Sequence, residues 1–215
     1  MNIRQIQFSS ALTATLITTG TMNQMSKIAI VYHSGYGHTA AVAESVYKGA
    51  LSVDGSEVQL IKVDEVDAHW DDLAAADAII FGAPTYMGSA SAQFKTFADA
   101  SSKVWMAQGW ANKIAAGFTN SASPSGEKVN TLNGFIALAL QHGMIWVGQD
   151  LLPGGNHSTS TRDANNWVGS ALGLATQSNA DQGADIAPPA GDHATSEHFG
   201  KRIAIAAARW AAGAK

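Results

Sequence analysis

Short apolar runs alternate with longer segments of helical spacing over most of this chain. Each run is rich in Ile, Val, Ala and Phe and is bounded by polar or turn-forming residues, which is typical of a strand buried on both faces. The runs predict strands at residues 27–32, 57–62, 78–83, 113–119 and 143–147. Regular alternation of such strands with helices indicates a parallel sheet.

Between these runs, apolar residues recur at the spacing of an α-helix. The spacing predicts helices at residues 39–52, 69–75, 90–106, 127–141 and 196–212. One side of the last helix would bury Phe199, Ile203, Ala207 and Trp210. Five strands and five helices predict an α/β fold: a doubly wound five-stranded parallel sheet in a three-layer αβα sandwich.

Two segments depart from this rhythm. Residues 148–195 are rich in Gly, Asn, Ser, Asp and Pro and are too long for an ordinary connection, so they are interpreted as an insertion in a single domain at residues 25–215. The insertion is either a loose surface excursion or a lid or oligomer contact. Residues 1–24 are interpreted as a disordered leader or an upstream start, because Met25 directly precedes the first strand. A signal peptide is the competing interpretation, but it would need a more basic and more apolar segment.

Composition limits the classes of function. Of the 215 residues, 46% are hydrophobic and 14% are charged, and the formal net charge is -4. The absence of a basic stripe argues against nucleic acid as a partner. No apolar run approaches the length of a membrane span, so no membrane partner is expected. The chain has no cysteine, which excludes disulfides and thiolate chemistry and fits a reducing compartment, and we expect a cytoplasmic protein.

The most informative motif follows the first predicted strand and opens the first predicted helix. It reads Ser34-Gly35-Tyr36-Gly37-His38-Thr39. Glycines let backbone N–H groups turn toward an anion, the hydroxyls of Ser34 and Thr39 add donors, and the positive end of the helix favours negative charge. Because the loop has no Lys or Arg, it would bind phosphate through dipoles and hydrogen bonds alone. The same residues fit a dinucleotide fingerprint, but the acidic residue expected to hold the ribose, Asp64, lies beyond the usual spacing.

Two more unusual loops follow the third and fourth predicted strands. The second loop contains Pro84, Thr85, Tyr86, Met87 and Gly88. It combines a proline-fixed turn, a glycine that permits close approach, and a flat, polarizable surface. The third loop is a row of polar residues that includes Thr119, Asn120, Ser121, Ser123 and Gly126. Each loop alone also fits an ordinary turn. Ligands bind outside the carboxyl ends of parallel strands, so the three together predict one site with a phosphate cradle, an aromatic ledge and hydrogen-bond donors.

These loops, in this order, resemble those of flavodoxin-fold flavoproteins, and most closely the NAD(P)H:quinone oxidoreductases of the tryptophan-repressor-binding-protein type. The likeness covers residues 27 to about 210. It rests on a Ser-x-Tyr-Gly-His pattern from Ser34 to His38, an Ala-Ile-Ile-Phe-Gly strand with a Pro-Thr turn from Ala78 to Thr85, and a His-Gly-Met step that begins at His142. The resemblance implies noncovalent FMN, with its phosphate in the first loop and its isoalloxazine ring between the second and third loops.

The chain departs from that family at three places. The family's second loop usually reads Pro-Thr-Arg-Phe-Gly-Asn, so Tyr86 puts a phenol where the family has a cation near the flavin edge. The third loop is stiffer and more polar than the family's Thr- and Gly-rich one. The family's insertion after the second strand, which is associated with tetramers, is almost missing, because only residues 63–77 connect the second and third strands. We therefore expect a homo-oligomer but assign no tetramer.

The histidines receive separate interpretations. His142 either lies beside the flavin, as the family implies, or caps the helix that ends at Gln141. It is the one possible catalytic side chain, because the flavin itself carries the chemistry. The remaining histidines considered show no metal-ligand spacing with an acidic companion, so no metal site is predicted. They are His33, His38, His157, His193 and His198.

The sequence is interpreted as an FMN-dependent oxidoreductase. The hypothesis is that NAD(P)H delivers hydride to flavin N5, leaves, and is replaced by a quinone or related small acceptor that takes two electrons. The alternative is a flavodoxin-type electron carrier without its own substrate site. Such carriers tend to present a strongly acidic docking face, whereas this chain has a modest net charge of -4. A third possibility is an interaction module whose FMN is structural or absent.

Overall fold

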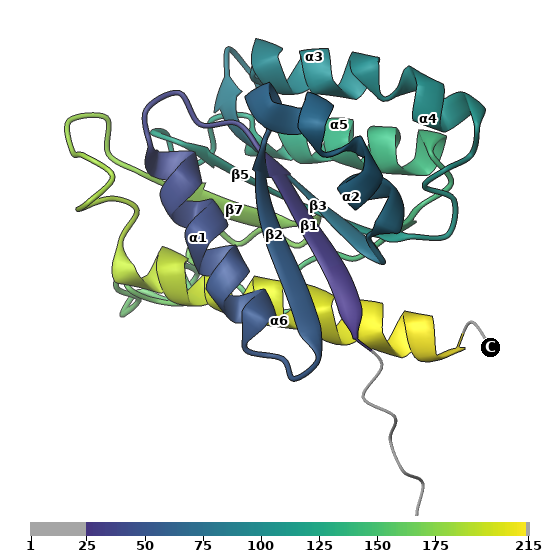
Figure 1. Ribbon diagram of the computed structural model, residues 1–215. Helices are drawn as coiled ribbons and strands as arrows, with labels where there is room; N and C mark the ends of the chain where they lie inside the picture. Colours follow the sequence, from purple (N-terminus) through teal and green to yellow (C-terminus); the bar gives the residue numbers. More distant parts are fainter. Residues whose placement is uncertain (1–24, 214–215) are drawn as a thin grey trace, which may run out of the picture.

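The computed structural model describes residues 25–213 of the chain (Figure 1). The expectations for residues 1–24 lie outside this range. The strands are β1 (Ser26–Tyr32), β2 (Ser56–Lys62), β3 (Ala78–Tyr86), β4 (Ser89–Ala90), β5 (Ile114–Ser121), β6 (Ile145–Trp146) and β7 (Leu174–Gln177). The helices are α1 (His38–Leu51), α2 (Trp70–Ala75), α3 (Ala92–Ala100), α4 (Ser102–Met106), α5 (Lys128–Gln141) and α6 (Ala190–Gly213), and a 3-10 helix η1 occupies Val63–Ala68.

The main sheet is parallel and has the order β2-β1-β3-β5-β6. The chain starts near the middle, moves outward to β2 and then crosses to the other side, which is the doubly wound arrangement. The predicted fold class is confirmed. The strand count differs, because the described part of the chain has seven strands in the sheet rather than five: β4 pairs with β3 in an antiparallel sense, and β7 pairs with β5.

The last position of the sheet is filled by two short strands. β6 pairs with the start of β5 at Ile114 and Ala115, and β7 pairs with its end, from Phe118 to Ser121. Between them the chain leaves the sheet and returns at Leu174. The predicted strand at residues 143–147 is therefore half of an interrupted one. The other half, Leu-Ala-Thr-Gln, is too short and polar to be recognised as a strand from its own pattern.

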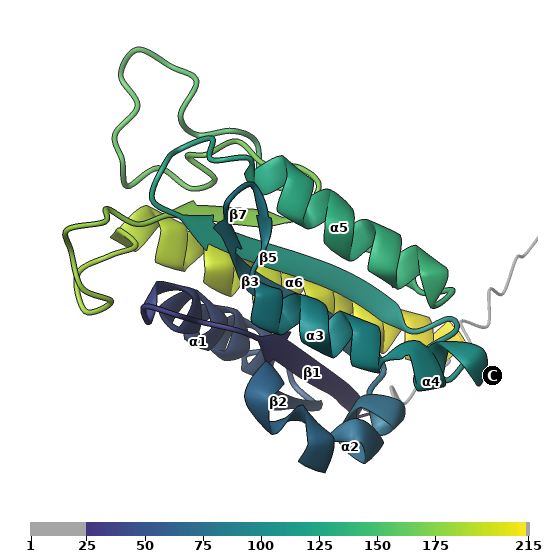
Figure 2. The same ribbon diagram turned by 90° about the horizontal axis from the view of Figure 1, so that it is seen from above.

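Two helical layers enclose the sheet, as Figures 1 and 2 show. Side chains alternate along a strand, so Ile28 and Ile30 of β1 face α1 and α6, whereas Ala29 and Val31 belong to the core under η1, α2, α3 and α5. Each core is a cluster of buried apolar side chains, and both clusters include side chains of β1 and β3. Because β1, β3 and β5 are parallel, the loops that follow them lie at one edge of the sheet.

Several boundaries differ from the predicted ones. The predicted helix at residues 90–106 is two helices, because the chain turns at Ser101, whose hydroxyl donates to the Ala98 carbonyl at 2.7 Å. The last helix begins at Ala190 rather than at residue 196, so the predicted insertion contains β7 and the first turn of α6. Trp210 is 46% exposed instead of buried, and its indole N–H donates to the Asn112 carbonyl at 2.7 Å. Within residues 25–213, no helix combines the length and apolar character needed to cross a bilayer.

Candidate functional site

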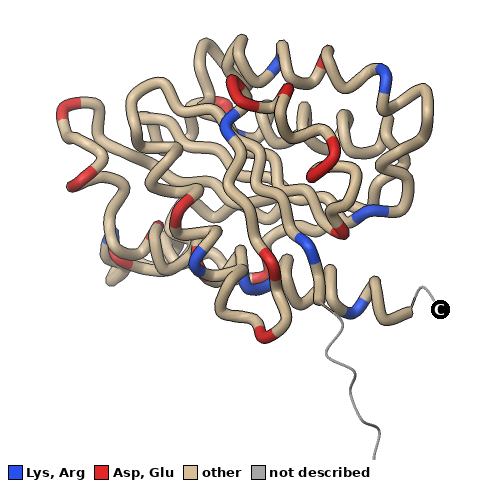
Figure 3. Tube along the Cα trace, viewed as in Figure 1, with Lys and Arg blue, Asp and Glu red and all other residues tan. Residues whose placement is uncertain are grey.

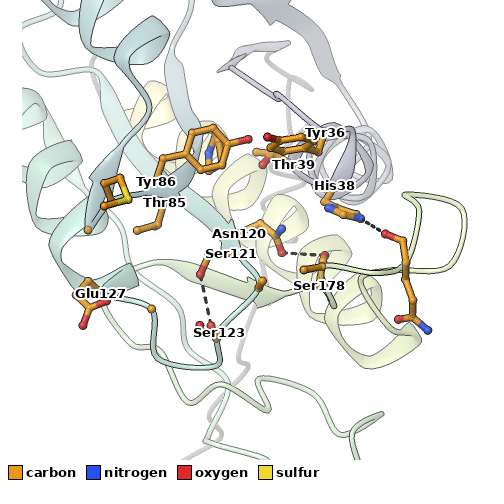
Figure 4. A pocket seen from close by; sticks show the side chains of 17 residues that line it. Tyr36, His38, Thr39, Thr85, Tyr86, Asn120, Ser121, Ser123, Glu127 and Ser178 are labelled. Carbon is orange, nitrogen blue, oxygen red and sulfur yellow. Dashed lines mark hydrogen bonds between the residues drawn. The ribbon is translucent and has the colours of Figure 1, made fainter.

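A pocket of about 930 Å³ lies at the carboxyl ends of β1, β3 and β5 (Figure 4). That volume lies within the range of small-molecule sites, about 300–1,000 Å³. The structure brings most of the predicted site residues to its lining: Tyr36, His38, Thr39, Pro84, Thr85, Tyr86, Met87, Gly88, Asn120, Ser121, Ser123 and Gly126. The lining also includes residues that the sequence did not single out: Ala122, Glu127, Ser178, Ala180 and Gln182.

The first loop leads into α1, and among the described residues two N–H groups at the start of this helix have no acceptor. The Ser34 hydroxyl oxygen accepts hydrogen bonds from the N–H groups of Gly37 and Ala40, both at 3.1 Å, and Gly37 adopts the left-handed conformation with φ 89°. Within residues 25–213, the N–H groups of His38 and Thr39 donate to no other atom. The first turn of α1 carries no acidic side chain that would compensate the helix dipole. The loop therefore has the donors for an anionic group.

The first loop is also tightly enclosed. A Cβ atom added to Gly35 would lie 2.5 Å from the Tyr86 hydroxyl, and one added to Gly37 would lie 3.1 Å from the Ala184 Cβ. Thr39 is only 2% exposed. None of the described residues that line the pocket is Lys or Arg. The sequence prediction that backbone and hydroxyl donors of this loop hold a phosphate group stays a prediction.

The segment after β7 covers the first loop. The His38 Nε2 atom is 2.8 Å from the Gln182 carbonyl oxygen, so the imidazole donates to the backbone of this segment (Figure 4). Ala184 packs over Gly37. Sequence reasoning missed these contacts because it did not recognise β7, which carries the segment to the pocket edge.

The second loop is a tight hairpin that projects an aromatic ledge. Met87 (φ 46°) and Gly88 (φ 85°) form the two-residue turn between β3 and β4, and both have the positive φ that such turns require. Tyr86 meets Tyr36 with ring centroids 6.1 Å apart and planes at 74° (Figure 4). Burial, with a smaller contribution from Tyr36, raises the pKa of Tyr86, so its phenol is neutral at physiological pH. The Met87 side chain is fully exposed.

A buried chain of hydroxyls supports the floor of the pocket. The Thr85 hydroxyl lies 2.7 Å from that of Thr119 and 2.8 Å from that of Thr131. Thr119 is fully buried and does not line the pocket. Its role is therefore to hold Thr85, which does line the pocket.

Asn120 has its amide orientation set by its neighbours. Its Oδ1 atom accepts hydrogen bonds from the hydroxyls of Thr176, at 2.9 Å, and Ser178, at 3.1 Å. The amide nitrogen donates to no other atom of residues 25–213 and belongs to a side chain that lines the pocket. Asn120 therefore offers the pocket a donor, and β7 supplies one of the hydroxyls that orient it.

Lys128, the first residue of α5, holds the third loop in place. Sequence reasoning did not find this residue. Lys128 is 3% exposed, and its Nζ donates to the Ser121 hydroxyl at 2.6 Å, to the Pro124 carbonyl at 3.3 Å and to the Ser123 carbonyl. Burial lowers the pKa of Lys128 to about 8. A lysine beside a Ser-rich turn is ordinarily assumed to be exposed, so no local signal indicated this role.

The structure does not bring His142 to the pocket. His142 follows the end of α5 and precedes β6, so it lies at the opposite edge of the sheet, because a residue that precedes a parallel strand lies at its amino end. Its Nε2 atom is 2.9 Å from the Ser101 hydroxyl, and its ring packs on Trp110 with centroids 4.3 Å apart. Burial lowers the pKa of His142, which favours the neutral imidazole and disfavours a charged helix cap. His142 therefore does not line the pocket of this chain; it is the C-cap residue of α5, and its placement relative to a flavin stays a prediction.

Comparison with known proteins agrees with this geometry. The family model described as NADPH-dependent FMN reductase matches residues 35–157, which include the second and third loops and all of the first loop except Ser34. The chain is 43% identical over 184 residues to the flavodoxin FldP of Pseudomonas aeruginosa (strain UCBPP-PA14), covering 84% of this chain and 96% of that protein. It is 36% identical over 146 residues to an NAD(P)H dehydrogenase (quinone) of Trichlorobacter lovleyi, covering 58% of this chain and 72% of that protein.

The solved structures lead to the same fold. The crystal structure of the flavodoxin, WrbA-like protein from Agrobacterium tumefaciens superposes with a TM-score of 0.66 at 40% identity, covering 86% of this chain and 98% of that chain. A flavodoxin from the domain Archaea superposes with a TM-score of 0.58 at 21% identity, covering 84% of this chain and 98% of that chain, and supports the fold alone.

Proposed function

The chain belongs to the NADPH-dependent FMN reductase family, and from this premise we propose that it reduces a quinone, or a similar flat acceptor, by two electrons at the expense of NAD(P)H. It is a flavodoxin-fold, FMN-dependent oxidoreductase. In the proposed reaction NAD(P)H, a proton and a quinone give NAD(P)⁺ and a hydroquinone. Bound FMN supplies the redox chemistry by accepting a hydride and passing on two electrons.

The residues proposed to hold FMN are those of the three loops. The free N–H groups of His38 and Thr39, with the hydroxyls of Ser34 and Thr39, would bind the phosphate. The Tyr86 ledge and the third loop would bind the ring, and Asn120 would donate to a polar group of the cofactor. The unpaired donors at the start of α1 support this assignment, because an anion satisfies N–H groups that otherwise lack an acceptor.

One observation favours an enzyme with its own acceptor site over an electron carrier. At the mouth of the pocket, Tyr36 is 80% exposed and Met87 is fully exposed, and both adjoin the ledge formed by Tyr86. Exposed aromatic and thioether surface next to a cofactor pocket suits a flat apolar ring. A quinone or a nicotinamide would dock against this surface.

The second candidate is an electron carrier, which the similarity to flavodoxin FldP favours. An electron carrier docks to its redox partners through the electrostatic field of its surface and has no substrate pocket of its own. Figure 3 shows acidic residues gathered over η1 and α2 and a mixture of acidic and basic residues elsewhere along the trace, and the net charge of the chain is -4. The modest net charge supports the enzyme over the carrier.

An anaerobic spectrum separates the two candidates. The full chain is reconstituted with FMN and mixed with NADPH or NADH, and 1,4-benzoquinone is then added. The proposal predicts loss of the visible absorbance of oxidised flavin with a nucleotide and its return, with hydroquinone formed in equal amount, on addition of the quinone. A flavin that stays oxidised with both nucleotides but is reduced by dithionite would overturn the proposal in favour of the carrier.

A variant tests the phosphate assignment. Replacing Ser34 and Thr39 together by Ala removes both hydroxyls at the start of α1, and the protein should lose FMN. Ser52→Ala is the matched control, since the Ser52 hydroxyl donates to the Gly49 carbonyl at 2.7 Å at the other end of the same helix. Stoichiometric FMN in the double variant would remove the assignment.

The proposal also includes a cytoplasmic homo-oligomer. Light scattering would test the oligomeric state, and cell fractionation would test the location.

A further inference from the structure

The third loop owes its shape to one buried cation. Between Ser121 and Glu127 the loop forms no strand or helix, and it turns through Gly126 (φ 50°) and Glu127 (φ 56°), two successive left-handed residues. Lys128 lies inside this turn, 3% exposed, and donates to a hydroxyl and two carbonyl groups of the loop. An ammonium has three N–H groups, so all of them are used on the loop.

These contacts orient the peptide groups of the loop. The carbonyl groups of Ser123 and Pro124 point at the Lys128 ammonium. In a trans peptide the N–H group points opposite to the carbonyl, so the N–H of Ser125 is directed away from Lys128. Ser121 and Ser123 both line the pocket, so the face of the loop that Lys128 leaves free belongs to the ligand site.

The charges that face Lys128 come from three segments. Asp192 of α6 and the neighbouring Glu127 favour the ammonium, whereas Arg162 of the segment between β6 and β7 opposes it. Arg162 is itself paired with Asp192 at 3.0 Å. Burial is the larger influence and lowers the pKa of Lys128 to about 8. The ammonium is therefore close to losing its proton under mildly alkaline conditions, and no carboxylate among residues 25–213 contacts it directly to retain the proton.

We propose that Lys128 is a positioning residue that holds the third loop in its FMN-binding conformation through its ammonium, and that loss of this proton releases the loop and weakens FMN binding. A neutral amine has two N–H groups rather than three and lacks the charge that strengthens them, so at least one loop carbonyl loses its donor. The inference rests on the proposed placement of FMN against this loop.

The direct test needs no substitution. FMN is titrated into the full-length apoprotein, and the dissociation constant is measured by quenching of flavin fluorescence from pH 7 to pH 9. If only the protonated form binds, the apparent constant is the intrinsic one divided by the protonated fraction, which falls from about 0.9 to about 0.1 over this range. The dissociation constant should therefore rise about tenfold. The raised pKa of Tyr86 keeps its phenol from titrating in the same interval.

Two variants identify the titrating group. Lys128→Met fills the same volume without the charge, so it should bind FMN at least about tenfold more weakly at pH 7 and show no rise toward pH 9. Lys113→Met is the matched control. Lys113 also has a pKa lowered by burial and donates to two carbonyls, those of Ala74 and Ala76 at 2.8 and 2.5 Å, but it lies at the amino end of β5, away from the pocket. It should keep the wild-type profile.

The outcomes separate this inference from the proposed function. A wild-type dissociation constant that stays constant between pH 7 and pH 9, or a rise that persists in Lys128→Met, would overturn the role of Lys128 and leave FMN binding intact. An apoprotein that ignores FMN at pH 7 would instead overturn the placement of FMN in this pocket.

Discussion

The contact between α1 and α6 offers the sharpest test of the packing. The two helices cross so closely that their backbones touch: a Cβ atom added to Gly200 would lie 1.9 Å from the Val46 carbonyl oxygen, and one added to Gly49 would lie 1.8 Å from the Glu197 carbonyl oxygen. A backbone carbonyl cannot rotate away as a flexible side chain can. Gly200→Ala must therefore push the helices apart by more than about 1 Å to reach an ordinary C···O separation of about 3.3 Å.

The magnitude follows from two opposing effects. Overpacking of a closed core costs about 1–3 kcal/mol, and a clash with backbone belongs at the upper end of that range. Replacing Gly by Ala inside a helix stabilises the folded state by about 1 kcal/mol through helix propensity. The net loss in the free energy of unfolding is about 2 kcal/mol. For a chain of this size, 1 kcal/mol corresponds to about 2–4 °C, so the Tm of Gly200→Ala should fall by about 4–8 °C.

Gly134→Ala is the matched control. Gly134 lies within α5, and a Cβ atom added there would meet no atom of residues 25–213 within 4 Å. The same substitution should raise the Tm by about 2–4 °C, because only the gain in helix propensity remains. Thermal unfolding of both apoproteins followed by circular dichroism gives the comparison. Equal shifts for the two variants, or a Gly200→Ala protein as stable as the wild type, would refute the close helix contact.

Two further predictions concern the site and the pH dependence of stability. Asn120→Asp keeps the acceptor for its two hydroxyl neighbours but loses the donor, so FMN should bind at least about tenfold more weakly in fluorescence titrations; an unchanged dissociation constant would mean that this amide does not reach the cofactor. Burial alone would raise the pKa of Asp150, but the hydrogen bond from His198 and the charge of Arg202 outweigh it and lower the pKa below 3.8. This stabilisation is therefore present above about pH 4 and is lost as the pH falls through the lowered pKa. Urea unfolding of wild type and Asp150→Asn should differ at neutral pH and converge in acid, and a constant difference would contradict the pairing.

Much of the candidate site was predictable because its chemistry is local. The first loop joins glycines, hydroxyls and a helix start within six consecutive residues, so its capacity to bind an anion is visible in the chain itself. The buried strands were recognisable for a similar reason, since runs such as residues 78–83 can be satisfied only inside a sheet. Because parallel strands end at a common edge, these two facts together predicted that the three loops meet.

Other features depend on contacts between distant residues, and only the tertiary structure decided them. β7 is a strand because β5 offers it a free edge, and its own four residues carry no strand pattern. Lys128 is buried because the loop before it folds over its side chain, whereas its sequence neighbours favour an exposed helix start. His142 shares a family motif, yet strand direction places it at the far edge of the sheet. Hydrophobic periodicity and local hydrogen bonding are written in neighbouring residues, but burial, pairing and orientation arise only when separated segments pack against one another.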